Sequence, residues 1–179
     1  RLWLWLFVLG NVAVIAAFWW WNARHGVSPE GDMPLMAFGR LAGLLAAFCA
    51  LLQLLFISRI AWVEQAFGFD RLTHLHKYNG FLVVLFVVAH GMLITLQYAA
   101  SRDQSRCATL RGFVTDQEGV LAAMIASVLI AVIVLLSVGV VRRLLAYETW
   151  YFIHLAAYLA VVLAFGHQVE SGGDFTVNL

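Results

Sequence analysis

Five apolar runs of membrane-spanning length most constrain what this chain can fold into. A bilayer offers no hydrogen-bond partners to the backbone, so a spanning segment has to satisfy its own polar groups, and an isolated one does so as a helix. Such a helix needs about 20 apolar residues. The runs cover about residues 2–21, 35–57, 78–98, 120–141 and 150–167. With 63% hydrophobic and 12% charged residues, we expect an all-α, polytopic transmembrane helix bundle.

The connections between these runs differ in character. Segment 58–77 contains an amphipathic stretch, Ile60 to Phe69, which we expect to lie along the membrane interface. Segment 99–119 is the longest polar connection. Basic residues number five on each side of the membrane, so the positive-inside rule gives a tie, and we expect the side with Arg142 and Arg143 to be cytoplasmic. Because the chain starts at Arg1, we expect it to be part of a longer protein.

Four histidines lie in two of the predicted spanning helices or at their starts. His76, at the start of the third, and His90 are 14 residues apart, and His154 and His167, in the fifth, are 13 apart. One helix separates these segments, so they cross the membrane in the same direction. His76 and His154 then lie at helix starts, and His90 and His167 near helix ends. Fourteen residues span about 21 Å of helix, which predicts two sites at different depths, each with one imidazole from each helix.

Helical rotation supports one pair better than the other. At about 100° per residue, His90 returns to within roughly 40° of His76, whereas His167 lies roughly 140° from His154. A bend near Gly166, tightening of the helix, or a position of His167 just past regular helix would be needed to align the second pair. His74 would lie roughly 160° from His90, so we expect it to be a bystander, and we expect His25 to lie in a solvated loop.

Two facing imidazoles without a thiolate or carboxylate suit haem better than zinc. Structural zinc takes four protein ligands, whereas haem iron needs only axial ones. The residues therefore predict two bis-histidine b-type haems, which transfer electrons without an open iron position. A single membrane histidine could instead hydrogen-bond across helices. Small residues near the four histidines, such as Gly80, Gly91 and Ala160, would admit a porphyrin but also suit ordinary helix packing.

These residues resemble the ferric reductase-like transmembrane domain of NADPH oxidases and ferric reductases. The resemblance covers about residues 35–168, and its motifs are His76 followed by Lys77, His90 fourteen residues later, and the segment Trp150–His154 with His167. It implies that His76 and His154 bind the inner haem, and that His90 and His167 bind the outer haem. The 14 and 13 spacings resemble those of the family.

Two arginines also resemble family positions. Arg40 and Arg59 open and close the second predicted helix, 19 residues apart, and the resemblance implies that each neutralises haem propionates. A cation bordering an apolar helix needs an anionic partner, although Arg59 could equally extend to lipid headgroups.

The chain departs from the family in two respects. Oxidases have a second histidine one turn after the outer ligand of the third helix, where this chain has Ile94, so an oxygen-reducing pocket is not implied. The family's sixth helix and its cytosolic FAD and NAD(P)H domains are missing from this sequence. A separate or further reductase module is therefore the expected partner.

The sequence thus predicts a multi-pass oxidoreductase domain spanning residues 1–179 in a bacterial inner membrane. Electrons would pass from a cytosolic reduced flavin or NAD(P)H module through two haem b groups to a ferric chelate, oxygen or a partner protein outside. Membrane lipid is a further partner, and nucleic acid is not, since the net charge is +1. A quinol-oxidising cytochrome b subunit and a non-redox transport or assembly protein are the alternatives.

Overall fold

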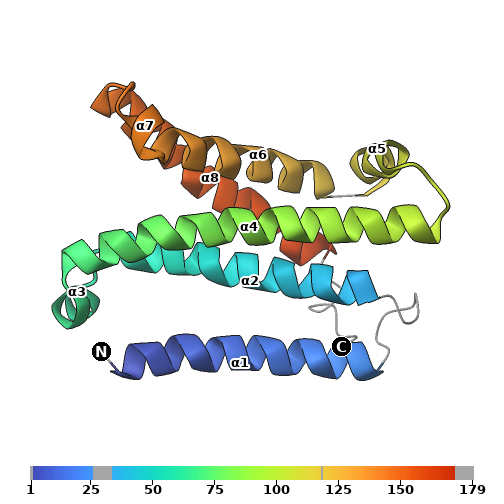
Figure 1. The fold of residues 1–179 in the computed structure, drawn as a ribbon, viewed down its shortest axis with the longest axis horizontal. Helices are drawn as coiled ribbons and strands as arrows, with labels where there is room; N and C mark the ends of the chain where they lie inside the picture. Colours follow the sequence, from blue (N-terminus) through green and yellow to red (C-terminus); the bar gives the residue numbers. More distant parts are fainter. Residues whose placement is uncertain (1, 26–33, 118, 172–179) are drawn as a thin grey trace. The chain divides into compact units, whose positions relative to one another are not determined.

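The computed structural model describes residues 2–25, 34–117 and 119–171. All regular secondary structure in these residues is helical. Figure 1 shows the helices in chain order: α1 (Leu2–His25), α2 (Pro34–Ile57), α3 (Ala61–Phe67), α4 (Phe69–Ser101), α5 (Arg106–Asp116), α6 (Val120–Ser137), α7 (Gly139–Arg142) and α8 (Tyr147–Ser171). Five of them, α1, α2, α4, α6 and α8, are long and apolar enough to cross a membrane. The predicted all-α class and the five spanning helices are confirmed.

The chain forms two compact units, residues 1–103 and residues 104–179. The first unit contains α1 to α4 and the second contains α5 to α8. Each unit has one dominant helix pair, α2 with α4 in the first and α6 with α8 in the second. The four histidines divide between the units, two on α4 and two on α8.

Helices α2 and α4 pack antiparallel along their length (Figure 1). Gly39, near the start of α2, lies opposite His90, and Gln53, near its end, lies opposite His76. Helix α1 joins this pair through α2, where the indole Nε1 of Trp19 donates a hydrogen bond of 2.6 Å to the carbonyl of Ala37. The first unit is therefore a three-helix arrangement in which α2 is central.

The short helix α3 closes one end of the first unit. Its Val63 and Phe67 are buried, and they pack with Phe56 of α2 and Leu72 of α4 in one hydrophobic cluster. Trp62 on the same helix is exposed and contacts the ring of Trp3 at a centroid distance of 5.1 Å. Residues Ala61–Phe67 of the predicted amphipathic segment thus form a helix whose Val63 and Phe67 are covered by this unit, whereas its position along the membrane interface stays a prediction.

In the second unit, α6 and α8 also pack antiparallel. Ser137 at the end of α6 lies beside His154 in the first part of α8, and Gly119 at the start of α6 lies beside His167 near the end of α8. The predicted fourth span divides into α6 and the short α7, because Val138 adopts an extended conformation between them. The polar connection 99–119 contains the helix α5, whose N-cap Ser105 accepts a hydrogen bond from the Ala108 amide.

The third predicted helix is longer than its apolar run. Helix α4 begins at Phe69 rather than near Tyr78, so His76 lies seven residues inside it. Helix α8 begins at Tyr147, which places His154 likewise seven residues inside. The prediction that these two histidines lie at helix starts is therefore wrong, but their equal distance from the helix starts is retained. The first turns of α4 contain polar residues, so they lie outside the apolar run from which the helix was predicted.

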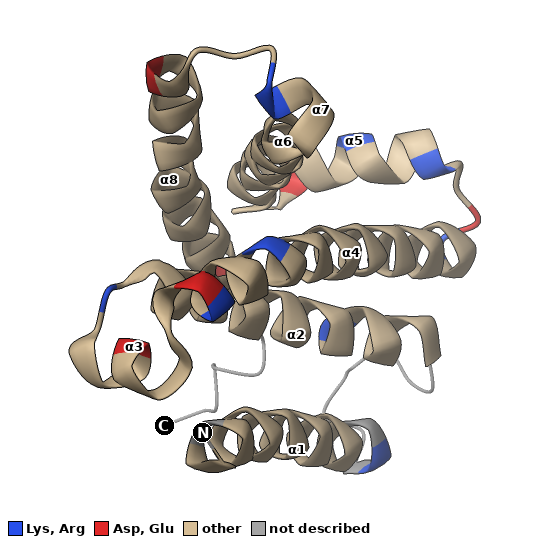
Figure 2. Ribbon diagram, turned by 60° about the vertical axis from the view of Figure 1, so that its left-hand side comes forward, with Lys and Arg blue, Asp and Glu red and all other residues tan. Residues whose placement is uncertain are grey.

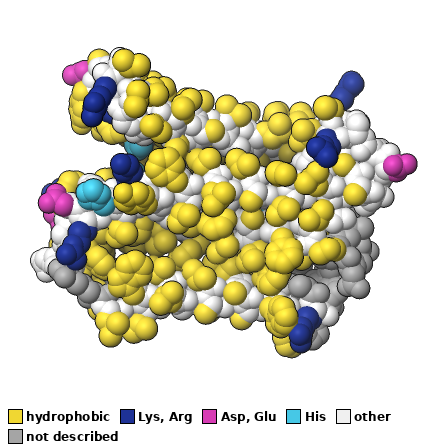
Figure 3. Space-filling model, in the orientation of Figure 1, with side chains coloured by type: hydrophobic (Ala, Val, Ile, Leu, Met, Phe, Trp, Pro, Cys, Tyr) yellow, Lys and Arg dark blue, Asp and Glu magenta, His cyan; other side chains and the backbone are white. Residues whose placement is uncertain are grey.

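The surfaces of the spanning helices fit a lipid environment. On the face drawn in Figure 3, hydrophobic side chains cover the helices along their lengths. Leu85 of α4, Val128 of α6 and Val162 of α8 are 58%, 62% and 67% exposed, as expected for residues that face acyl chains. Along the spanning helices most Lys, Arg, Asp and Glu residues lie near an end (Figure 2).

Candidate functional site

Both histidines of α4 are turned toward the backbone of α2. The Nδ1 atom of His90 lies 2.8 Å from the carbonyl oxygen of Gly39, and that of His76 lies 3.3 Å from the carbonyl oxygen of Gln53. A carbonyl oxygen carries no hydrogen, so each Nδ1 has to be the protonated nitrogen that donates. The ring's other nitrogen, Nε2, is then the one with a lone pair suited to a metal.

The two α4 contacts form one arrangement that is repeated along the helix pair. Gly39 and Gln53 are 14 residues apart, as are His76 and His90. Because the helices are antiparallel, each histidine meets an α2 carbonyl at the corresponding depth. The 14-residue spacing therefore gives two imidazoles about 21 Å apart along the helix, each with its Nδ1 directed at a carbonyl of α2.

Glycine lets α2 approach His90 closely. A Cβ atom at Gly43 would stand 2.8 Å from Nδ1 and 3.1 Å from Cε1 of His90, closer than real Cβ contacts allow. A Cβ atom at Gly39 would similarly meet the Ile94 side chain at 2.8 Å. Ile94, which stands where oxidases have a second histidine, thus packs on the α2 backbone beside the His90 contact.

A buried polar cluster adjoins His76. Asn79, only 6% exposed, donates through Nδ2 to the carbonyl of Cys49 at 2.7 Å and to Oε1 of Gln53 at 2.9 Å. Gly80 makes room for this cluster, since a Cβ there would come within 3.0 Å of the Gln53 amide nitrogen. In a membrane such interhelical hydrogen bonds hold helices in register. This cluster fixes the rotation of α2 that presents the Gln53 carbonyl to His76.

The ring of His154 on α8 contacts the side chains of Ser137 and Trp150. Its Nδ1 lies 3.4 Å from Oγ of Ser137 on α6, and the indole Nε1 of Trp150 donates to the same Oγ at 3.2 Å. The Trp150 ring also stacks on the His154 ring, with a centroid distance of 4.9 Å and an interplanar angle of 29°. The guanidinium of Arg142 lies over the Trp150 ring, 4.6 Å from the ring centroid.

His167 lies within α8, which continues to Ser171, so it does not lie past regular helix. Its backbone passes close to Gly119, where a Cβ would come within 3.4 Å of the His167 Cα. Gly119 has a φ of +75°, a left-handed conformation that favours glycine. His90 and His167, the two histidines assigned to the outer site, therefore each have a glycine of the neighbouring helix against them.

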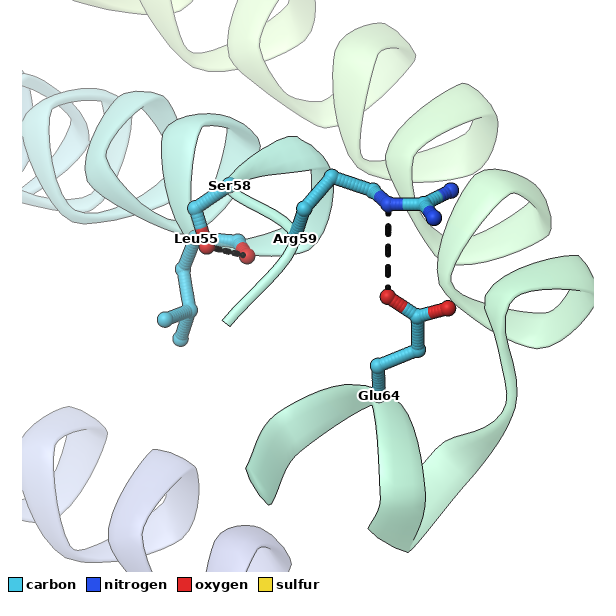
Figure 4. A network of polar contacts seen from close by, with 4 residues as sticks. All are labelled: Leu55, Ser58, Arg59 and Glu64. Atoms are coloured by element: carbon cyan, nitrogen blue, oxygen red, sulfur yellow. Dashed lines mark hydrogen bonds and ion pairs between the residues drawn. The ribbon is translucent and has the colours of Figure 1, made fainter. Parts of the chain in front are cut away.

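The two predicted propionate partners have different surroundings. Arg40 is half-buried within α2 and directly follows Gly39, the residue whose carbonyl accepts from His90. Arg59 lies beyond the end of α2, with a φ of 56°. Its Nε forms an ion pair of 3.3 Å with Glu64 (Figure 4), and its guanidinium lies 4.5 Å from the Phe69 ring centroid. The expectation that Arg59 ends the second helix is wrong, because the chain turns there into α3.

The structure brings together some predicted residues and adds others. His76 and His90 share α4 and one pair of contacts with α2, whereas the pairing of His76 with His154 and of His90 with His167 stays a prediction. His74 is exposed, and His25 is the last residue of α1 rather than part of a loop. Among the described residues, no three His, Cys, Asp or Glu side chains converge on a metal-sized site. Sequence reasoning missed Ser137, Gln53 and Gly43, which contact the histidines from neighbouring helices.

Comparison with known proteins identifies the family. The family model described as "Ferric reductase like transmembrane component" matches residues 42–165, which is most of the chain and includes His76, His90 and His154. No curated protein and no solved structure matches the chain. With five helices of spanning length, this match makes the protein a multi-pass integral membrane protein. The chain belongs to the ferric reductase-like transmembrane component family.

Proposed function

We propose that this domain carries electrons across the membrane through two haem b groups, each bound by one histidine of α4 and one of α8. The main support for this proposal is the contact that both α4 histidines make with the α2 backbone. His76 and His90, 14 residues apart, each direct Nδ1 to an α2 carbonyl, and so present Nε2 as the nitrogen for an axial bond. Carbonyl oxygens that accept a hydrogen bond from the ring nitrogen opposite the metal generally orient metal-binding histidines.

The residues present fit a haem. Imidazole nitrogens are common axial ligands of haem iron, and the bound group supplies one-electron chemistry through its iron. The contacts with the α2 backbone keep both α4 rings in place before any ligand binds, which lowers the cost of ordering them. Helix α2 approaches the ring of His90 closely at Gly43, and the start of α6 approaches the backbone of His167 closely at Gly119. Each histidine proposed for the outer haem therefore packs against a neighbouring helix.

Depth supports the pairing that we propose. His76 and His154 each lie seven residues after the start of their helix, at Phe69 and Tyr147. The spanning helices α4, α6 and α8 follow one another, so α4 and α8 cross the membrane in the same direction. His76 and His154 then serve the inner haem, and His90 and His167 serve the outer one.

The arginines contribute unequally to the proposed sites. Arg40 directly follows Gly39, whose carbonyl accepts from His90, and this position supports the proposal that Arg40 compensates propionate charge at the outer haem. Arg59 is paired with Glu64, so serving a propionate at the inner haem would require it to exchange one carboxylate for another.

The electron donor that we propose is a reduced flavin in an FAD- and NAD(P)H-binding module on the cytoplasmic side. The acceptor is a ferric chelate, oxygen or a partner protein on the opposite side. Because both axial positions of each iron would be filled by histidine, the acceptor would be reduced without binding to iron. Ile94, packed on Gly39, supplies no polar group for an oxygen pocket beside the outer site.

Haem content and single-histidine variants test this proposal. The protein purified with a haem supply should contain two haems per chain and show a reduced-minus-oxidised b-type spectrum. His90→Leu should lose one haem and keep the other. His74→Leu is the matched control, because His74 lies on the same helix but is exposed, and it should keep both.

Double variants test the pairing. His76→Leu combined with His154→Leu should remove only the inner haem, because both residues bind it. His76→Leu combined with His90→Leu should remove both haems. Absence of a haem spectrum in the haem-supplied protein would refute electron transfer through haem. Loss of both haems in the first double variant would refute the assignment of partners, because it would mean that His76 and His154 bind different haems.

A further inference from the structure

One hydroxyl at the end of α6 holds two side chains of α8. Oγ of Ser137 lies 2.7 Å from the carbonyl of Ile133, 3.2 Å from Nε1 of Trp150 and 3.4 Å from Nδ1 of His154. All four residues belong to the second unit. This contact differs from those of His76 and His90, because a side chain rather than the backbone provides the acceptor.

The direction of each hydrogen bond follows from the number of hydrogens. A serine hydroxyl has one hydrogen and two lone pairs. A carbonyl can only accept, so the Ser137 hydrogen goes to Ile133, four residues earlier. An indole N–H can only donate, so Trp150 takes one lone pair of Oγ. The remaining lone pair faces Nδ1 of His154, which therefore has to carry the hydrogen and donate.

Trp150 completes the support of the His154 ring. Its indole is fixed at one edge by the bond to Ser137, and its face stacks on the imidazole at 4.9 Å. The hydroxyl thus sets the tautomer of His154 and, through Trp150, limits the tilt of its ring. Both effects depend on a single atom that a point substitution can remove.

We propose that Ser137 is a positioning residue for His154 as a haem ligand, acting directly on Nδ1 and through Trp150. The inference rests on the proposed haem function. An Nδ1–H that donates makes the imidazole a more basic ligand, and a more basic ligand stabilises ferric over ferrous iron. Removing the acceptor should therefore raise the midpoint potential of the haem bound by His154 and leave the other haem unchanged.

Ser137→Ala tests the inference, with Ser127→Ala as its matched control. Both serines lie on α6, and Ser127 likewise donates at 2.7 Å to the carbonyl four residues earlier, Ala123. Redox titration followed at the haem absorption bands should show one of the two potentials raised in Ser137→Ala. A change of about tenfold in the reduction equilibrium would appear as 59 mV for this one-electron couple. Ser127→Ala should titrate like the unaltered protein.

Two further variants separate positioning from general damage. Ser137→Thr keeps the hydroxyl and should restore the potential toward that of the unaltered protein. Trp150→Phe keeps a stacking ring but loses the N–H, and should broaden the low-spin ferric signal of the same haem in electron paramagnetic resonance. Equal potentials in Ser137→Ala and Ser127→Ala, in protein that holds both haems, would overturn the proposed role of Ser137 and leave the proposed haem function standing. Failure to bind haem in the unaltered protein would overturn the haem function together with it.

Discussion

The two compact units hold their histidines by different means. On α4, His76 and His90 donate to backbone carbonyls of α2, whereas on α8, His154 donates to the side chain of Ser137. A backbone acceptor is retained whatever residue occupies its position, so it can be disturbed only by moving the helix or crowding the ring. A side-chain acceptor can be deleted by one substitution. The orientation of His76 and His90 therefore depends on helix approach and register, and that of His154 depends on the identity of a few side chains.

Crowding at Gly43 should have the largest effect. Gly43→Ala would place a Cβ 2.8 Å from Nδ1 of His90, so the imidazole has to leave the Gly39 carbonyl. Loss of such an orienting contact lowers metal affinity by about 10- to 100-fold. We expect the variant to lose the outer haem while keeping the inner one, as measured by haem content per chain and by the loss of one step in a redox titration.

Gly10→Ala is the control for this substitution. Gly10 also lies in a spanning helix, α1, and a Cβ there would have no described heavy atom within 4 Å. It should keep both haems. If Gly43→Ala also bound two haems with unchanged potentials, the backbone contact of His90 would not be what holds the ring.

The sequence predicted the spans well because membrane helices need only long apolar runs. It missed the first turns of α4 and the whole of α5 because these helices are polar, and a single cap, Ser105, was the local signal for α5. The sequence singled out the four histidines by their spacing in apolar segments, and their role as haem ligands stays a prediction. The acceptors of His76 and His90 could not be predicted, because a carbonyl such as that of Gln53 has no sequence signature and the α2 register is set by packing. Gly43 and Ser137 had the right chemistry but nothing in the sequence placed them opposite a histidine.

Disturbing the register of α2 and α4 should have a smaller effect. Asn79→Leu removes both hydrogen bonds to α2 and leaves Oε1 of Gln53 without this donor. Interhelical hydrogen bonds in membranes are worth roughly 0.6 to 2 kcal/mol. We expect the inner haem to be released at a lower temperature than in the unaltered protein, as followed by its absorption in detergent.

Thr95→Val provides the comparison for Asn79→Leu. Thr95 is also buried on α4, but its hydroxyl donates within the helix, to the Gly91 carbonyl at 2.6 Å. Its loss should leave the release temperature of the inner haem nearly unchanged. Equal release temperatures in the two variants would mean that the register of α2 does not depend on the Asn79 cluster.

The smallest effect should come from the side-chain support of the second unit. Arg142 lies over the Trp150 ring at 4.6 Å and donates to the Leu145 carbonyl at 3.1 Å, and it is half-buried. Arg142→Gln removes a cation–π contact worth about 0.5–1 kcal/mol at such sites. Arg143→Gln is the matched control, because it removes the same charge from the adjacent, exposed position. Only Arg142→Gln should lower the unfolding midpoint in detergent, followed by tryptophan fluorescence. An equal decrease in both variants would assign the effect to charge near the membrane rather than to the Trp150 stack, and the side-chain support of His154 would then end at Trp150.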